Sequence, residues 1–112
     1  MKLQPIVYTT NMERAVDWYG KVLAANPIYT SDIWTSFAVG DAALGIHHVE
    51  ERAAASNVEL SLIATSPLEE VHGRLVAAGI AIERGIQDEP FGRSLLLRDP
   101  DGSAVQVNEH HE

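Results

Sequence analysis

The feature that most constrains this chain of 112 residues is an internal repeat of a strand-to-helix junction. Thr9-Thr10-Asn11-Met12-Glu13 falls opposite Thr65-Ser66-Pro67-Leu68-Glu69, at an offset of 56 residues. In each half, one strand is expected before the junction and a helix with three further strands after it. Because such self-similarity is the mark of a duplicated folding unit, the sequence predicts an α+β fold of two tandem βαβββ modules with curved, half-open mixed sheets.

The apolar periodicity places the elements of each module. In the first module we expect a strand at 3–9, a helix at 12–23 with a capping box at 10–13, and strands at 28–31, 34–39 and 42–49. In the second we expect a strand at 58–65, followed by a helix. Ser66 is the expected N-cap of this helix, Pro67 its first position and Glu69 the end of a capping box, and Gly79 is expected to end the helix. Three strands, at 80–83, 93–98 and 103–108, are expected to follow. The chain is then a single domain over 1–112, with module 1 at about 1–50, a linker at about 50–57 and module 2 at about 58–112.

The composition of the chain excludes several kinds of chemistry and disfavours several kinds of binding partner. The chain has no cysteine, which excludes disulfides, thiolate nucleophiles and thiolate metal ligands. Its formal net charge of −8 opposes binding to nucleic acid or anionic lipid and favours a cationic small ligand. No apolar run approaches the ~20 residues of a membrane span, and no signal peptide is recognised at the start, so we expect a cytoplasmic protein with neither nucleic-acid nor membrane partners.

The predicted sheets leave one face free for a ligand. Because a helix covers only one face of each sheet, the two uncovered faces are expected to form a shared cleft. A two-residue turn at Gly40-Asp41 pairs Val39 with Ala42 and sets Trp34 opposite His47. In the first strand of module 2, alternation places Glu59 in the cleft, although the strict offset would put Leu60 there. The expected cleft residues are Gln4, Ile6, Tyr8, Trp34, Ser36, His47, Glu59, Ser61, Gln106 and Asn108.

Two segments point to a known family. Residues 11–19 with Leu23 look like the first-helix pattern of the vicinal oxygen chelate superfamily, and Phe91-Gly92-Arg93 with the Asp99-Pro100-Asp101-Gly102 turn looks like its closing hairpin. The chain therefore resembles, over essentially its whole length, a superfamily that includes glyoxalase I, extradiol dioxygenases, fosfomycin-resistance enzymes and bleomycin-resistance proteins.

The resemblance implies four positions that hold a divalent metal in catalytic relatives. These positions fall here on Gln4, Gly45, Glu59 and Gln106. His47 lies one step beyond Gly45 on the same face. At the position of Gln106, metal-binding members usually carry Glu. Two neutral amides with one carboxylate and one displaced imidazole are a weak set of ligands. We therefore expect no metal or other cofactor, with Gln4, His47, Glu59 and Gln106 as the ligands if a divalent ion binds.

The expected function is metal-independent binding or sequestration of a small organic ligand, as the resemblance to the bleomycin-resistance branch implies. Tyr8 and Trp34 would be platforms for an aromatic or cationic ligand, and Glu59 a general base or a counter-charge. The cleft would belong to a homodimer, which also covers unpaired sheet edges. Whether the chain is an enzyme stays open: the alternatives are a metal-dependent lyase, isomerase or dioxygenase of glyoxalase type, and a non-catalytic accessory domain.

Overall fold

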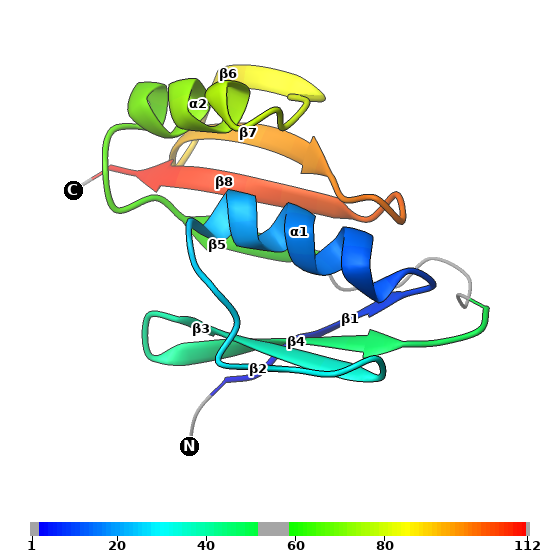
Figure 1. Ribbon diagram of the computed structural model, residues 1–112. Coiled ribbons are helices and arrows are strands. Elements are labelled where there is room, and N and C mark those ends of the chain that lie inside the picture. The colour runs from blue at the N-terminus through cyan, green and yellow to red at the C-terminus, as the bar shows by residue number, and fades with distance from the viewer. Residues whose placement is uncertain (1–2, 52–58, 112) are drawn as a thin grey trace. The chain divides into compact units, whose positions relative to one another are not determined.

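A computed structural model describes residues 3–51 and 59–111, which form two compact units divided between residues 56 and 57 (Figure 1). Each unit is a βαβββ module, so the predicted fold is confirmed. The elements are β1 (Ile6–Thr9), α1 (Met12–Leu23), β2 (Tyr29–Thr30), β3 (Trp34–Val39), β4 (Ala42–His48), β5 (Leu60–Ile63), α2 (Leu68–Ala77), β6 (Arg84–Glu89), β7 (Gly92–Arg98) and β8 (Ala104–His110). Most of the expected linker at 50–57, and Val58 at the expected start of the next strand, lie outside the described residues.

In module 1 the strands lie in the order β1-β4-β3-β2, with β1 parallel to β4 and the other pairs antiparallel. The register predicted from the Gly40-Asp41 turn is confirmed, since Val39 pairs with Ala42 and Trp34 with His47. Helix α1 covers one face of this sheet, as its apolar stripe predicts. The buried core consists of Ala15, Tyr19 and Val22 from α1 and Phe37, Leu44 and Ile46 from the sheet.

Module 2 repeats this topology in the order β5-β8-β7-β6, with β5 parallel to β8. Helix α2 buries Leu68, Val71 and Leu75, and the buried apolar residues of the sheet are Leu95, Leu97, Val105 and Val107. No helix among the described residues is long and apolar enough to cross a membrane.

The strand expected at 80–83 is wrong. Ile80 is buried and donates its N–H to the Leu75 carbonyl at 2.9 Å, so it closes the end of α2 just after Gly79, whose φ is +81°. The edge strand β6 begins only at Arg84 and is mostly polar. An edge strand of this kind lacks the apolar alternation from which strands are predicted, and this explains the error.

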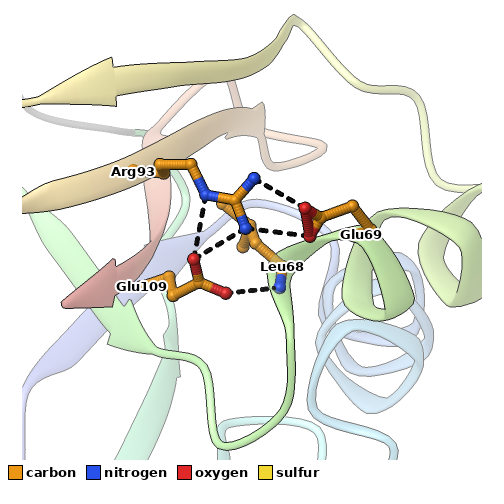
Figure 2. Close-up of polar contacts among 4 residues, drawn as sticks. All are labelled: Leu68, Glu69, Arg93 and Glu109. Atoms are coloured by element: carbon orange, nitrogen blue, oxygen red, sulfur yellow. Dashed lines mark hydrogen bonds and ion pairs between the residues drawn. The ribbon is translucent and has the colours of Figure 1, made fainter. Parts of the chain in front are cut away.

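The helix caps also differ from the prediction. Asn11 is the N-cap of α1, and its Oδ1 accepts from the Arg14 N–H at 3.1 Å. For α2 the N-cap is Pro67, which has no side-chain cap, rather than Ser66. Instead, the Leu68 N–H donates to Glu109 Oε2 at 2.8 Å, from β8 (Figure 2).

Figure 2 shows how the start of α2 is fixed to its sheet by Arg93 on β7. Arg93 Nη1 and Nη2 donate to the two carboxylate oxygens of Glu69 at 2.6 and 2.9 Å, and Nε and Nη2 donate to Glu109 Oε1 at 2.9 and 2.7 Å. The Arg93 hydrogen bond lowers the pKa of Glu69 to about 2. The pKa of Glu109 is lowered chiefly by the Leu68 N–H and then by Arg93. The arginine of the Phe91-Gly92-Arg93 segment thus serves the packing of module 2.

Candidate ligand-binding faces

We call the sheet face opposite the helix of each module its open face. In module 1 the strand register and alternation assign to this face the side chains that do not pack on α1. It carries several aromatic rings and no Asp, Glu, Lys or Arg from its strands. Its members are Ile6, Tyr8, Tyr29, Trp34, Ser36, Ala38, Ala43, Gly45 and His47.

Three rings gather at the centre of the open face of module 1. The Tyr8 and His47 ring centroids lie 5.7 Å apart in an edge-to-face arrangement, and those of Trp34 and His47 lie 6.3 Å apart. The Trp34 indole also lies against Gly45, where an added Cβ would overlap Cη2 and come within 2.7 Å of Cζ2. Gly45 therefore provides the space that this indole occupies.

His47 is placed on this face as predicted from the turn register. Its Nδ1 is buried and has no hydrogen-bond partner within the described part of the chain. A buried nitrogen without a partner is unfavourable in the free protein.

Gln4 lies just before β1 and is exposed. The carbonyls of Leu3 and Pro5 accept from the N–H groups of Ala43 and Gly45, so the ladder of β1 with β4 continues through this segment. Alternation then places Gln4 on the same face as Ile6 and Tyr8.

The open face of module 2 is polar. Two pairs of hydrogen-bonded side chains join β8 to β5 and to Glu59, which immediately precedes β5: Gln106 Nε2 donates to Glu59 Oε2 at 3.1 Å, and Asn108 Nδ2 donates to Ser61 Oγ at 2.6 Å. Asn108 is only 5% exposed, yet its Oδ1 has no partner among the described residues. The four residues that the sequence analysis assigned to the cleft from this half are thus brought together within module 2.

The choice of Glu59 over Leu60 for this face agrees with the structure. Glu59 and Ser61 are exposed, whereas Leu60 and Leu62 are half-buried. The offset of 56 residues fails here: Ile6 of β1 pairs with Gly45 on the open face, whereas Leu60 and Leu62 of β5 pair with the buried Val105 and Val107.

Sequence reasoning missed a second polar group on this face, which lies on β6 and β7. Arg84 Nη2 donates to Ser94 Oγ at 2.9 Å, and Ser94 Oγ donates to Glu89 Oε1 at 2.9 Å. Hydrogen bonds from Gln87 and Ser94 lower the pKa of Glu89. The misplaced edge strand concealed this group; alternation counted back from β7 across the Pro90-Phe91 turn places Glu89 on the face of Ser94, but the register shift between Arg84 and Gln87 hides Arg84 from such counting.

The donors on these faces do not fit a divalent metal ion well. The described residues contain no group of three or more His, Asp or Glu side chains that could hold one. Of the four expected positions, Gln4 and Gln106 offer neutral amides, and Glu59 already accepts a hydrogen bond from Gln106. The Trp34 indole covers Gly45, where the resemblance implies a carboxylate. Hard divalent ions favour several charged oxygen or imidazole ligands, which this set lacks.

Comparison with known proteins identifies the family. The profile described as "Glyoxalase/Bleomycin resistance protein/Dioxygenase superfamily" matches residues 3–107. The chain is 30% identical over 107 residues to the metallothiol transferase FosB of Shouchella clausii (strain KSM-K16), covering 88% of this chain and 73% of that protein. It is 24% identical over 111 residues to the phenazine antibiotic resistance protein EhpR of Enterobacter agglomerans, covering 91% and 86%.

Solved structures show the same fold. The glyoxalase/bleomycin resistance protein from Catenulispora acidiphila DSM 44928 superimposes with a TM-score of 0.83 at 23% identity, over 99% of both chains. Both the family profile and the duplicated βαβββ topology span nearly all of the sequence. This chain therefore belongs to the glyoxalase/bleomycin resistance protein/dioxygenase superfamily.

Proposed function

We propose that this protein binds a small organic molecule through its open sheet faces, without a divalent metal. The observation that carries the proposal is the Trp34 indole lying against Gly45. At this position, where the resemblance implies a metal-binding carboxylate, the chain presents an aromatic surface. Tyr8 and His47 extend this surface.

The chemistry of module 1 favours a planar aromatic ligand. An aromatic guest stacks on an indole or packs edge-to-face against a neighbouring ring, and each such pair contributes about 0.5–1.5 kcal/mol beyond area burial. The half-buried Trp34 and the exposed Tyr8 leave ring surface accessible. One relative, EhpR, is described as a phenazine antibiotic resistance protein. Phenazine is a planar tricycle of this kind, and we take it as the test ligand.

Charge and sheet edges support two further parts of the proposal. The net charge of −8 favours a cationic ligand over an anionic one. Strands β1 and β2 are the edges of one sheet, and β5 and β6 are those of the other. Unpaired edges are commonly covered by association, so we propose that the working form is a homodimer.

The test is a fluorescence titration of chelator-treated protein with phenazine. The chain has two tryptophans, Trp34 on the open face and Trp18 on α1, so Trp18→Phe is the matched control for Trp34→Phe. We expect saturable quenching that survives in Trp18→Phe and is lost in Trp34→Phe, because only Trp34 lies on the proposed platform. Quenching that is absent from the wild type, or that persists in Trp34→Phe, would overturn the proposal.

The similarity to the metallothiol transferase FosB favours a second candidate, a metal-dependent enzyme. In that case Gln4, His47, Glu59 and Gln106 would hold the ion, or Glu59 would act as a base. This candidate requires stoichiometric binding of an ion such as Mn²⁺, Ni²⁺ or Zn²⁺ to the purified protein. Elemental analysis before and after chelation distinguishes this candidate from metal-independent ligand binding.

A further inference from the structure

We propose that the open face of module 2 contains a subsite, formed by Asn108 and Glu59, for a planar cationic group rich in N–H donors, such as an amidinium or guanidinium. The inference rests on the proposed function and deepens it by naming the ligand chemistry that this module recognises. It uses contacts within module 2 alone, whereas the aromatic platform belongs to module 1.

Asn108 supplies the first acceptor. It lies on the central strand β8, beside Ser94 of β7 and Ile63 of β5 in the register. Its Nδ2 is held by Ser61 at 2.6 Å, which fixes the amide plane, while the buried Oδ1 has no partner among the described residues. Protein interiors rarely leave such an acceptor unpaired. A ligand N–H donor is the group that would satisfy it.

Glu59 supplies the charge. It lies on the same face at the start of β5, and Gln106 engages only its Oε2 within the part of the chain that the structure describes. Its exposed carboxylate can therefore accept further hydrogen bonds through Oε1. An uncharged acceptor and a carboxylate on the same face suit a delocalised cation that presents several N–H groups in one plane.

The neighbouring cation does not cancel this preference. Arg84 lies on the same face, but its guanidinium donates to Ser94 and to backbone carbonyls. Glu89 accepts from the same Ser94 hydroxyl and interacts electrostatically with Arg84. Arg84 and Glu89 thus share the Ser94 hydroxyl on the β6–β7 side of the sheet, whereas Glu59 lies immediately before β5 at the opposite edge.

The test is an NMR titration of the full chain with benzamidinium and, separately, with benzoate. The two probes have nearly the same shape, but benzamidinium is a cation that donates hydrogen bonds and benzoate is an anion that accepts them. We expect benzamidinium to shift the Asn108 side-chain amide and the backbone amides around Glu59 in a saturable manner, and benzoate to leave them unchanged. An Asn108 amide in the reversed orientation would present N–H groups and favour benzoate.

Single substitutions distinguish binding of benzamidinium at the subsite from non-specific attraction of the cation to an acidic protein. Glu59→Gln should weaken benzamidinium binding by about tenfold or more, the usual effect of losing a hydrogen bond to a charged group. Glu70→Gln, which removes the same charge from α2, should leave it within about twofold, because α2 covers the other face of the sheet and a distant exposed charge is screened by salt. Asn108→Asp keeps an acceptor and should retain binding, whereas Asn108→Leu should abolish it. A dispersed amide spectrum confirms that each variant is folded.

Three results would overturn the subsite: binding of benzoate at the same resonances, equal effects of Glu59→Gln and Glu70→Gln, or no binding of benzamidinium. If the subsite fails in any of these ways while Trp34-dependent quenching by phenazine persists, the proposed function stands without it. If phenazine quenching fails while benzamidinium binds in the Asn108-dependent manner, the aromatic platform of the proposed function is refuted and the subsite remains.

Discussion

Substituting Gly45 by Ala tests the packing at the centre of the proposed platform. The Cβ that this substitution adds would overlap Cη2 of Trp34 and lie 2.7 Å from Cζ2, whereas ordinary contact begins at 3.4 Å. Because Cη2 lies closer than Cζ2, the indole must move by more than about 0.7 Å or swing away from the sheet.

Overpacking of this size costs roughly 1–3 kcal/mol. For a domain of this length, that cost corresponds to a fall in melting temperature of roughly 4–12 °C. Gly73→Ala is the matched control, because a Cβ there meets no atom within 4 Å. Gly73 lies within α2, so this control should stabilise the protein by up to about 1 kcal/mol.

The assay is urea unfolding of Gly45→Ala, Trp34→Ala and the double variant. If the cost arises from the indole, Gly45→Ala should be nearly neutral when Trp34 is already replaced by Ala, with a coupling energy of about 1 kcal/mol or more. Phenazine should also bind Gly45→Ala more weakly than the wild type, because the displaced indole no longer forms the same surface. Additive effects of the two substitutions, together with unchanged phenazine binding, would refute this account of Gly45.

Three further predictions concern the scaffold. Gly92→Ala should destabilise the fold by about 3 kcal/mol or more in urea unfolding, because the φ of Gly92 is +150° and a Cβ would overlap the Glu109 carbonyl oxygen. A loss of stability below about 1 kcal/mol would contradict this. Asn11→Ala should cost about 1 kcal/mol by removing the α1 cap, and Asn11→Asp should retain most of the stability; equal losses in the two variants would refute the capping role. The pKa of Glu69 is lowered from 4.5 to about 2 in the folded protein, so its ion pair with Arg93 stabilises the fold above about pH 4.5 and this contribution is lost as the pH falls towards 2. The stability difference between wild type and Glu69→Gln should therefore shrink over that range, and a difference that is constant with pH would argue against the ion pair.

Much of the scaffold could be predicted because local signals determine it. The helix at 12–23 has the predicted bounds, since its apolar stripe and the following Asn26-Pro27 are strong signals. The register of β3 with β4 follows from one two-residue turn. The side of the sheet on which Glu59 lies follows from alternation along β5.

The errors occur where a distant residue or an edge position decides the structure. Ser66 has the composition of an N-cap, but the orphan N–H of Leu68 is satisfied by Glu109, which is 41 residues away in sequence. The polar strand β6 carries little hydrophobic signal, so Arg84 was not placed on the sheet. The unpaired Oδ1 of Asn108 depends on side-chain geometry that sequence patterns do not encode.

The most direct test of metal-independent ligand binding compares the affinity of one ligand for two preparations of the protein. Isothermal titration with phenazine would be carried out on chelator-treated protein and on protein equilibrated with Mn²⁺, Ni²⁺ or Zn²⁺. We expect the same dissociation constant in both preparations, with Trp34 required for binding in each. Binding that appears only when one ion per chain is present, and that disappears in Glu59→Gln, would contradict it.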